Sequence, residues 1–307
     1  MIPTFNQSIF IREAIDSALA QTYQNIEVIV GDDASTDMTG EIVRSIKDLR
    51  LKYIRNKNNI GRVSNYRNLL YNHASGDYVV NLDGDDYYTD LDFIKDAVEL
   101  AKEKATVLIV TARTTRKSIT SESFSEVPRI RTLTGMQILR KLPNRRYLFQ
   151  HMATLYHRNT ALAIDFYRSS SISSDWESLY RLSILGEVKY LDRNIGVWRI
   201  HKSNATGAAS SKEILENQLI WIAIYNDAIN NGMNYFIASY KTAKCIAYSA
   251  QSAYPSISKN GNASLTNFLL GIFYTCKLSV LITLMSPKYM IRLMISYFGY
   301  YRDENIV

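Results

Sequence analysis

Cysteine is nearly absent from this chain of 307 residues, which holds only Cys245 and Cys276. Two cysteines so far apart exclude a disulfide framework and a zinc cluster, and they fit a reducing compartment. The first residues also lack a charged segment followed by an apolar one, so we expect no secretory signal. A cytoplasmic protein is therefore expected.

The chain also lacks an apolar run of about 20 residues, the length that a spanning helix needs. Residues 265–274 and 278–285 are strongly apolar, but Lys277 separates them. Cationic residues and tyrosines follow, which is typical of helices that lie in a membrane interface. We expect peripheral contact with the inner face of the cytoplasmic membrane through residues 265–301. The alternative is a helical pair packed on the rest of the chain or on a second copy, as in a homo-oligomer.

Positive charge is concentrated in one segment. The formal net charge is +7, and residues 112–146 carry nine lysines and arginines against two glutamates. Such a segment suits an anionic partner, such as nucleic acid, a phosphorylated lipid or a membrane surface, although a solvated basic loop explains it equally well.

What the sequence does contain is a regular alternation of helical and strand patterns. Apolar residues at helical spacing predict helices at residues 9–20, 39–49, 62–73, 92–104 and 175–185. Short apolar runs predict strands at residues 26–30, 51–55, 78–82, 106–110, 152–157, 188–191 and 196–200. Strands separated by helices predict an α/β fold with a Rossmann-like, mostly parallel sheet flanked by helices.

Strand signals stop near residue 205, and helical patterns continue beyond it. We expect an α/β domain over residues 1–205 and a helical extension over residues 206–307. Met1 and Ile2 resemble the end of a strand that has no beginning. We therefore expect the first strand to be truncated, a hypothesis that the reading frame upstream of Met1 would test.

Two acidic clusters follow predicted strands, at residues 32–37 and 83–86. In open α/β sheets ligands bind outside the carboxyl ends of the strands, so both clusters are candidate sites. The first is explained equally well by helix capping or a turn. In the second, three carboxylates within four residues repel one another unless a cation lies between them. Oxygen ligands favour Mn²⁺ or Mg²⁺ completed by phosphate oxygens, so a diphosphate partner is expected.

A series of short motifs in the first 90 residues resembles the family 2 glycosyltransferases, which have the GT-A fold. The matching motifs are residues 2–6, 17–23, 30–37, 59–61, 67–68, 76–78 and 82–86. The resemblance implies an inverting hexosyltransferase that moves a sugar from a nucleoside diphosphate-sugar, expected to be a UDP-sugar, to an acceptor hydroxyl. It also implies a glycan or lipid-linked glycan acceptor in bacterial surface polysaccharide synthesis, such as O-antigen or capsule, and no nucleic-acid partner.

The same resemblance implies the residues of the site. Asp83 and Asp85 form a DxD-type motif, and the segment around His201 resembles an Arg-x-His segment that closes such sites. We expect the metal to be held by Asp85, Asp83 and His201; which of Asp83, Asp85 and Asp86 ligates it directly stays open. The expected nucleotide-sugar-binding residues are Pro3, Thr4, Asn6, Asp32, Asp33, Arg67, Asp83, Gly84, Asp85 and Arg199.

Asp175 is the expected catalytic base. A base must lie across the anomeric carbon from the diphosphate, so it should come from a segment distant from residues 83–86. Residues 174–177 resemble a family segment with Glu-Asp before an aromatic residue, although Ser174 replaces the glutamate. Glu177 is the alternative base, and a third reading is that Asp175 only stabilises a helix N-terminus.

Three other classes of protein were weighed. A receiver-like phosphoacceptor also has an acidic pair after one strand and a further aspartate after a later strand, as Asp32, Asp33 and Asp83 are placed here. Its site also needs a lysine after a later strand, and none occurs near residues 132–137. A nucleotidyltransferase would need a glycine-rich phosphate loop, which residues 3–6 do not supply. A non-catalytic sugar-nucleotide-binding scaffold would need no base, so Asp175 argues against it.

Overall fold

The computed structural model describes residues 1–129, 131–201 and 210–259, and the chain divides into two compact units. The first comprises Met1–Ile138, Asn144–Ser170 and Ser174–His201. The second comprises Leu139–Pro143, Ser171–Ser173 and the chain from Lys202 onward. It therefore includes two short stretches that precede the expected boundary near residue 205, and that boundary stays a prediction.

A parallel sheet of three strands begins the first unit. Its central strand β2 (Val28–Asp32) pairs with β1 (Ile2–Thr4) on one side and β3 (Leu51–Arg55) on the other. All of β2 is buried, which explains its unbroken run of β-branched residues. The three strands match their predicted positions to within a few residues.

A second, mixed sheet completes the first unit. Its main strand order is β4-β9-β6-β10-β5, with β7 paired to β6 and β8 paired to β10. Only β6 and β10 run parallel; the other pairs are antiparallel. The α/β class is confirmed, but the expected mostly parallel arrangement is limited to the first sheet. The strands are β4 (Tyr78–Val80), β5 (Tyr87–Tyr88), β6 (Val107–Lys117), β7 (Glu122–Phe124), β8 (Thr132–Thr134), β9 (Thr154–His157) and β10 (Glu187–Arg199).

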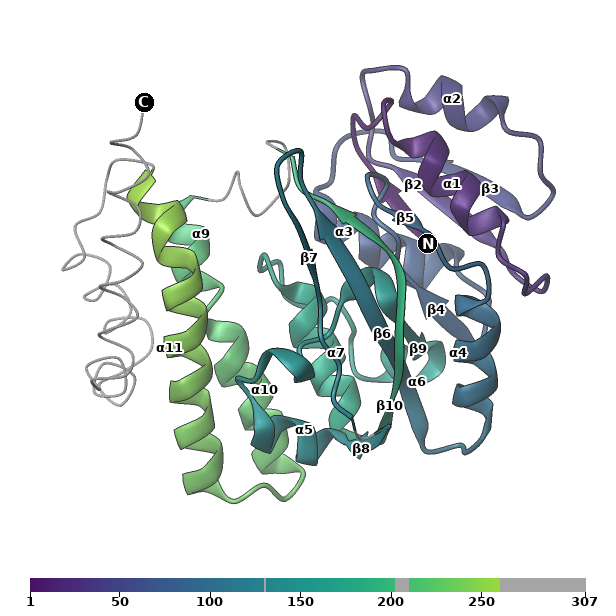
Figure 1. Ribbon diagram of the computed structural model, residues 1–307. Coiled ribbons are helices and arrows are strands. Elements are labelled where there is room, and N and C mark those ends of the chain that lie inside the picture. The colour runs from purple at the N-terminus through teal and green to yellow at the C-terminus, as the bar shows by residue number, and fades with distance from the viewer. Residues whose placement is uncertain (130, 202–209, 260–307) are drawn as a thin grey trace. The chain divides into compact units, whose positions relative to one another are not determined.

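Helices pack against both sheets of this unit (Figure 1). Ile15, Phe93 and Val110 bring α1, α4 and β6 into one hydrophobic core. The helix predicted at residues 62–73 is present, but its last turn is a π-helix over Leu69–His73. The helices are α1 (Ile11–Leu19), α2 (Thr39–Ser45), α3 (Arg62–Asn68), α4 (Phe93–Lys102), α5 (Gly135–Lys141), α6 (Arg158–Ala163) and α7 (Ser174–Ile184), with short 3-10 turns at Arg145–Tyr147 and His151–Ala153.

The two sheets meet where β1 lies beside the chain that leaves β4. Leu82 N donates to Met1 O at 3.0 Å, and Gly84 N donates to Pro3 O at 3.2 Å. Because β1 is also parallel to β2, the carboxyl ends of β1, β2 and β4 lie at one edge. Both acidic clusters of the sequence therefore come to the same edge.

The described part of the second unit is helical. It contains α9 (Ser211–Glu216), α10 (Leu219–Asn230) and α11 (Tyr235–Lys259). Ser210 and Glu213 form a capping box at the start of α9. Trp221 is fully buried and its Nε1 donates to Ser249 Oγ at 2.9 Å, so it combines core packing with a satisfied hydrogen bond.

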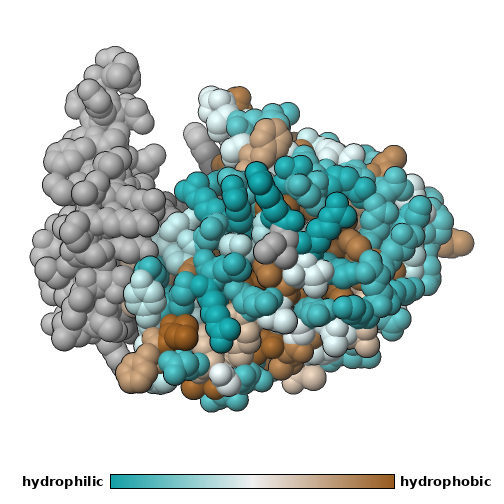
Figure 2. Space-filling view, turned by 60° about the horizontal axis from the view of Figure 1, so that its bottom comes forward, coloured by the Kyte–Doolittle hydropathy of each residue, from teal (hydrophilic) through white to brown (hydrophobic). Residues whose placement is uncertain are grey.

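Membrane contact was expected through residues 265–301, which lie outside the described residues. Within the described ranges, no helix combines the length and the hydrophobicity that crossing a membrane would require. On the face drawn in Figure 2, hydrophobic residues occur in small groups among hydrophilic ones.

Candidate active site

The acidic loop, residues 83–86, directs its three carboxylates to three different partners. Asp83 Oδ1 accepts a hydrogen bond of 2.6 Å from Tyr66 OH. Asp85 Oδ2 lies 2.8 Å from His201 Nε2. Asp86 Oδ1 instead accepts from a backbone N–H of β10. Asp83 and Asp85 are therefore the members of this loop that face other side chains.

Arg199, at the end of β10, ties the acidic loop in place. Its backbone N–H donates to Asp86 Oδ1 at 2.9 Å, and its Nη1 donates to Asp85 O at 2.6 Å. Nη2 is ion-paired with Glu13, and the guanidinium lies 4.2 Å from the centroid of the Tyr87 ring. These contacts hold a positive charge beside the loop, and the expected nucleotide-sugar-binding role of Arg199 stays a prediction.

Gly84 is required by a close approach to β1. A Cβ at this position would lie 2.9 Å from Thr4 Oγ1, which a real side chain could not tolerate. Thr4 Oγ1 in turn donates to Gln7 Oε1 at 2.8 Å, and Pro3 O accepts from Gly84 N. Pro3, Thr4 and Gly84 thus form one contact that seats the acidic loop against β1.

Burial and mutual repulsion disfavour the charged forms of the acidic loop. Burial, followed by the charge of Asp83, raises the pKa of Asp85. Burial, followed by the charges of Asp85 and Asp83, raises the pKa of Asp86 well above its usual range. A cation bound here would relieve this repulsion, so the donor set fits a hard divalent ion.

Asp85 and His201 are two side chains that could hold such an ion, since Asp85 Oδ2 lies 2.8 Å from His201 Nε2. The His201 ring also stacks on the Phe10 ring, with centroids 5.1 Å apart, and this packing fixes the orientation of the imidazole. Within the described ranges, no three His, Cys, Asp or Glu side chains form a metal-binding group by themselves. Mg²⁺ is commonly held by one or two protein ligands together with substrate phosphates, and this pair fits that pattern.

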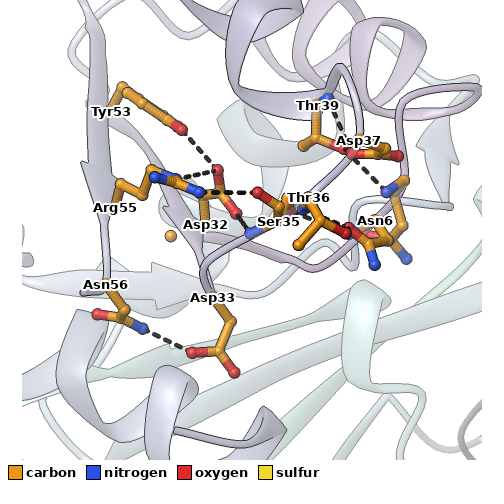
Figure 3. Close-up of polar contacts among 12 residues, drawn as sticks. Asn6, Asp32, Asp33, Ser35, Thr36, Asp37, Thr39, Tyr53, Arg55 and Asn56 are labelled. Carbon is orange, nitrogen blue, oxygen red and sulfur yellow. Dashed lines mark hydrogen bonds and ion pairs between the residues drawn. The ribbon is translucent and has the colours of Figure 1, made fainter. Parts of the chain in front are cut away.

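Asp32, at the end of β2, uses both carboxylate oxygens inside the protein (Figure 3). Oδ1 accepts from Ser35 N at 2.8 Å, whereas Oδ2 accepts from Tyr53 OH at 2.5 Å and lies 3.5 Å from Arg55 Nε. Asp32 is fully buried. These contacts shape the turn that follows β2. A turn is the alternative explanation given above for the acidic cluster at residues 32–37.

Asn6 has a similar local role. It has a positive φ of 52°, and its Oδ1 accepts from Thr36 N at 2.8 Å. Its own N–H donates to Ser35 Oγ at 2.9 Å. Figure 3 shows Asn6 beside Thr36, on the side of the turn away from Tyr53. Asn6 therefore joins the loop after β1 to the loop after β2, and its expected contact with the nucleotide stays a prediction.

Asp33 points in a different direction from Asp32 (Figure 3). Its Oδ1 accepts from Asn56 Nδ2 and from Ile60 N, each at 2.9 Å. Oδ2 accepts from Gly61 N, also at 2.9 Å. Asp33 thereby fixes the chain that enters α3.

Arg67 lies on a different side of α3 from Tyr66, the residue of this helix that donates a hydrogen bond to Asp83. Its Nη1 lies 2.6 Å from Asp165 Oδ1 and donates to Phe166 O at 3.0 Å. The guanidinium also covers the Tyr71 ring, 4.2 Å from its centroid. These contacts place Arg67 among structural partners rather than with residues 83–86, so its geometry does not favour the expected nucleotide role.

Arg62 and Tyr66 are the residues that the sequence analysis missed. They are four residues apart, so both lie on the face of α3 that meets Asp83. Arg62 Cζ lies 5.6 Å from the centroid of the Tyr66 ring. The helix predicted at residues 62–73 does begin at Arg62, so the spacing of Arg62 and Tyr66 was an available signal, but no local pattern shows that this face meets Asp83.

Asp175 lies in the first turn of α7, as predicted. Ser178 Oγ, which lies one turn further along α7, accepts a hydrogen bond of 2.8 Å from Tyr167 N, and the Tyr167 ring lies 5.4 Å from the ring of Tyr66. The side chain of Asp175 is half-buried.

Glu177, the alternative base, lies in the same helix but is buried. Its Oε1 lies 2.8 Å from Arg168 Nε and 3.7 Å from Arg181 Nη1. Only 1% of Glu177 is exposed. An ion-paired, buried carboxylate cannot meet an acceptor, so Asp175 is the better candidate of the two.

The comparisons with known proteins agree with this geometry. Residues 1–165, more than half of the chain, match the model of the family described as glycosyl transferase family 2. The Escherichia coli protein named UDP-Glc:alpha-D-GlcNAc-diphosphoundecaprenol beta-1,3-glucosyltransferase WfaP is 42% identical over 88 residues, which are 29% of this chain and 35% of that protein. The uncharacterized glycosyltransferase EpsJ of Bacillus subtilis is 26% identical over 266 residues, or 80% of this chain and 76% of EpsJ.

Some matches cover only part of the relative. The matched region spans 12% of the glycosyltransferase GlyA of Streptococcus pneumoniae, with 38% identity over 28% of this chain. Among solved structures, Staphylococcus aureus TarS 1–349 in complex with UDP superposes with a TM-score of 0.66 and 19% identity, covering 99% of this chain and 90% of that one. By its sequence match and its GT-A fold, this chain belongs to glycosyl transferase family 2.

Proposed function

We propose that this chain transfers a sugar from a UDP-sugar to an acceptor hydroxyl, with inversion at the anomeric carbon and with the help of Mn²⁺ or Mg²⁺. The observation that carries the proposal is the edge formed by residues 83–86. Asp83 contacts Tyr66 and Asp85 contacts His201 there, beside β1, and α7, the helix that carries Asp175, contacts Tyr167, whose ring lies 5.4 Å from that of Tyr66. In this proposal the residues that bind the donor and the residue that acts as the base come from distant segments of the chain.

The reaction we propose is one displacement. The acceptor oxygen attacks the anomeric carbon, the bond from that carbon to the diphosphate oxygen breaks, and UDP leaves with the electron pair. Asp175 takes the proton of the attacking hydroxyl. A divalent cation held by Asp85 and His201, with Asp83 nearby, would neutralise the charge that develops on the diphosphate. Arg199 adds a fixed positive charge beside the same loop.

The donor and acceptor classes are supported by the relatives. TarS was solved with UDP and with UDP-GlcNAc, and WfaP is named for UDP-glucose. The names of WfaP and of a Campylobacter jejuni relative, 36% identical over 88 residues, specify acceptors linked to undecaprenol through a diphosphate. We propose a lipid-linked glycan acceptor and a role in surface polysaccharide synthesis.

A panel of donors tests the proposal. The full chain is incubated with UDP-, dTDP- and GDP-sugars, Mn²⁺ or Mg²⁺, and GlcNAc-diphosphoundecaprenol as the acceptor probe. We expect release of nucleoside diphosphate from a UDP-sugar, dependent on both metal and acceptor. Nucleotide binding without release from any donor would instead indicate a non-catalytic binding scaffold.

Membrane contact through residues 265–301 belongs to the same proposal, because a lipid-linked acceptor is presented at the inner face of the cytoplasmic membrane. We expect the full chain to sediment with membranes at low salt and to be released partly by high salt, since cationic side chains meet anionic headgroups. Recovery of all the protein in the soluble fraction, at low salt and without detergent, would exclude this attachment.

A further inference from the structure

The hydroxyl of Tyr66, a residue of α3, holds one oxygen of Asp83. It donates to Asp83 Oδ1 at 2.6 Å, a length typical of a hydroxyl that donates to a carboxylate. A tyrosine hydroxyl stays protonated at neutral pH, so Tyr66 is the donor of this pair. Oδ1 is thus engaged inside the protein, and Oδ2 is the oxygen of Asp83 that remains for a ligand.

The Tyr66 side chain has little freedom to move. Only 1% of Tyr66 is exposed. Its ring lies 5.4 Å from the ring of Tyr167 and 5.3 Å from that of His151, measured between centroids. Close packing on these two rings fixes the direction in which the hydroxyl points. The hydrogen bond therefore holds Asp83 Oδ1 in one place.

The two residues that pack on Tyr66 also bind the chain that enters the acidic loop. Asn81 lies two residues before Asp83 and is fully buried. Its Nδ2 donates to Tyr167 OH at 2.5 Å and lies 2.9 Å from His151 Nε2. The same His151 nitrogen lies 2.8 Å from Tyr167 OH. Tyr66, Asn81, His151 and Tyr167 form one cluster, here named the Tyr66 cluster, which holds both the start of the acidic loop and its first carboxylate.

The Tyr66 cluster is anchored through Tyr167. This residue has a φ of 59°, a left-handed conformation that is unfavourable for a bulky side chain. Such a conformation persists only where the surrounding contacts impose it. Here the backbone N–H of Tyr167 donates to Ser178 Oγ of α7 at 2.8 Å, and both residues are buried. The cluster is thus a rigid support under the acidic loop.

A rigid support has a physical purpose in a loop with three carboxylates. Asp83, Asp85 and Asp86 repel one another, and a carboxylate without a partner would turn away from the other two. The Tyr66 hydroxyl offsets part of this repulsion and keeps Asp83 in one orientation. A group that is already oriented loses less conformational freedom when its ligand binds, so binding is tighter.

We propose that Tyr66 is a positioning residue, whose hydroxyl orients Asp83 toward the metal and the diphosphate of the donor. This inference rests on the proposed function, which assigns the donor to the edge at residues 83–86. Carboxylates that bind metals are themselves hydrogen-bonded, and replacing the hydrogen-bonding residue typically lowers metal affinity or activity by about 10- to 100-fold. Tyr66 stands in that relation to Asp83.

Tyr66→Phe removes the hydroxyl and keeps the ring. With UDP present, Mn²⁺ binding followed by electron paramagnetic resonance should weaken about tenfold. The Mn²⁺ concentration for half-maximal transfer should rise by a similar factor, whereas saturating Mn²⁺ should restore most of kcat, because the metal then orients Asp83 itself. A purely structural role would lower the Tm and leave the dissociation constant for Mn²⁺ unchanged.

Tyr225→Phe is the matched control. Tyr225 is also a buried tyrosine whose hydroxyl donates inside the protein, to Leu139 O at 2.8 Å, but it belongs to α10 of the second unit. This variant should bind Mn²⁺ as the parent does. Equal Mn²⁺ affinity in Tyr66→Phe and in the parent, with UDP present, would overturn the proposal.

A double-mutant cycle tests whether Tyr66 acts through Asp83. Asp83→Ala removes the acceptor of the hydrogen bond, so adding Tyr66→Phe to it should weaken Mn²⁺ binding little further. A further loss of about tenfold would contradict the proposal. Thermal unfolding of the same four proteins without metal or donor should give non-additive shifts in Tm. Additive shifts would mean that the hydrogen bond does not couple the two residues, which would also overturn the proposal.

These measurements separate the role of Tyr66 from the proposed function, because Mn²⁺ binding and thermal unfolding need neither acceptor nor turnover. A parent that binds Mn²⁺ with UDP but releases no nucleoside diphosphate from any donor would refute the proposed transfer. The Mn²⁺ affinity of Tyr66→Phe would still decide the role of Tyr66 in that case. A parent that binds no Mn²⁺ with UDP present would overturn the role proposed for Tyr66.

Discussion

Asp175→Asn is expected to lower the rate of sugar transfer by about 10²-fold or more, the scale on which general bases act. The amide keeps the size of the carboxylate and much of its hydrogen bonding, but it cannot take a proton from the acceptor. Binding of the donor with metal should survive, because Asp175 belongs to α7 and not to the acidic loop. Initial rates at saturating donor and acceptor measure the effect.

Asp48→Asn is the control for this prediction. Asp48 is an aspartate that pairs with Arg50, and it lies at the amino end of β3. Its rate should match the parent. Transfer by Asp175→Asn at near the parent rate would show that Asp175 is not the base. A large loss in Glu177→Gln at unchanged Tm would then make Glu177 the candidate, despite its burial beside Arg168 and Arg181.

Asp85→Ala is expected to abolish transfer, and Asp83→Ala to do the same, while the protein stays folded. The physical reason is that both remove a carboxylate from the place where a cation would balance the diphosphate charge. Asp85 is the more direct ligand in our account, since its Oδ2 meets His201, whereas Asp83 Oδ1 is held by Tyr66. Mn²⁺ binding, followed by electron paramagnetic resonance, should weaken most in Asp85→Ala.

Asp96→Ala provides the comparison. Asp96 is a partly buried aspartate of α4 that pairs with Arg193, 2.8 Å from its Nη1, away from the acidic loop. This variant should bind Mn²⁺ and transfer sugar as the parent does. Full turnover by the parent in EDTA would contradict the metal assignment whatever the variants show.

The first 110 residues were predictable because their local patterns and their tertiary contacts agree. The buried strand β2 begins with the apolar run Val28–Val30, and the helical spacing of Ile11, Ala14 and Ile15 matches the buried face of α1. The motifs that resemble the family also lie in this part of the chain. Agreement between local signals and the final fold is what makes such segments predictable.

The second sheet was harder to predict because its strands do not alternate regularly. β10 was predicted as two short strands, but it is a single strand whose pairing with β6 contains register shifts. The irregularities near Tyr190 and Asn194 interrupt the two-residue period that marks a strand. β6 likewise continues to Lys117, into the basic segment that shows little periodicity.

The candidate site was predicted in composition but not in detail. The structure brings His201 to Asp85, whereas the roles that the resemblance implies for residues 83–86, His201 and Asp175 stay predictions. Asp32 was expected to bind the nucleotide, yet its oxygens are used by Ser35 and Tyr53 within the protein. A motif identifies a residue, but only tertiary contacts show which partners its side chain has.

Arg62 shows the opposite case. No motif marks it, and its place beside Tyr66, which binds Asp83, depends on tertiary contacts that the sequence does not show. Arg67 carries the motif but pairs with Asp165 instead. A difference of five residues on a helix changes the face by more than a quarter turn, and the sequence pattern does not show which face meets the acidic loop.

Equilibrium binding of UDP is the most direct test of the central claim, because it needs no knowledge of the acceptor. Calorimetric titration of the full chain with UDP in the presence of Mn²⁺ should show binding that weakens at least tenfold, about 1.4 kcal/mol, without the metal or in Asp85→Ala. Asp175→Asn should bind UDP as the parent does. Absence of UDP binding by the parent, or equal affinity with and without Asp85, would contradict the assignment of this edge as the nucleotide-sugar site.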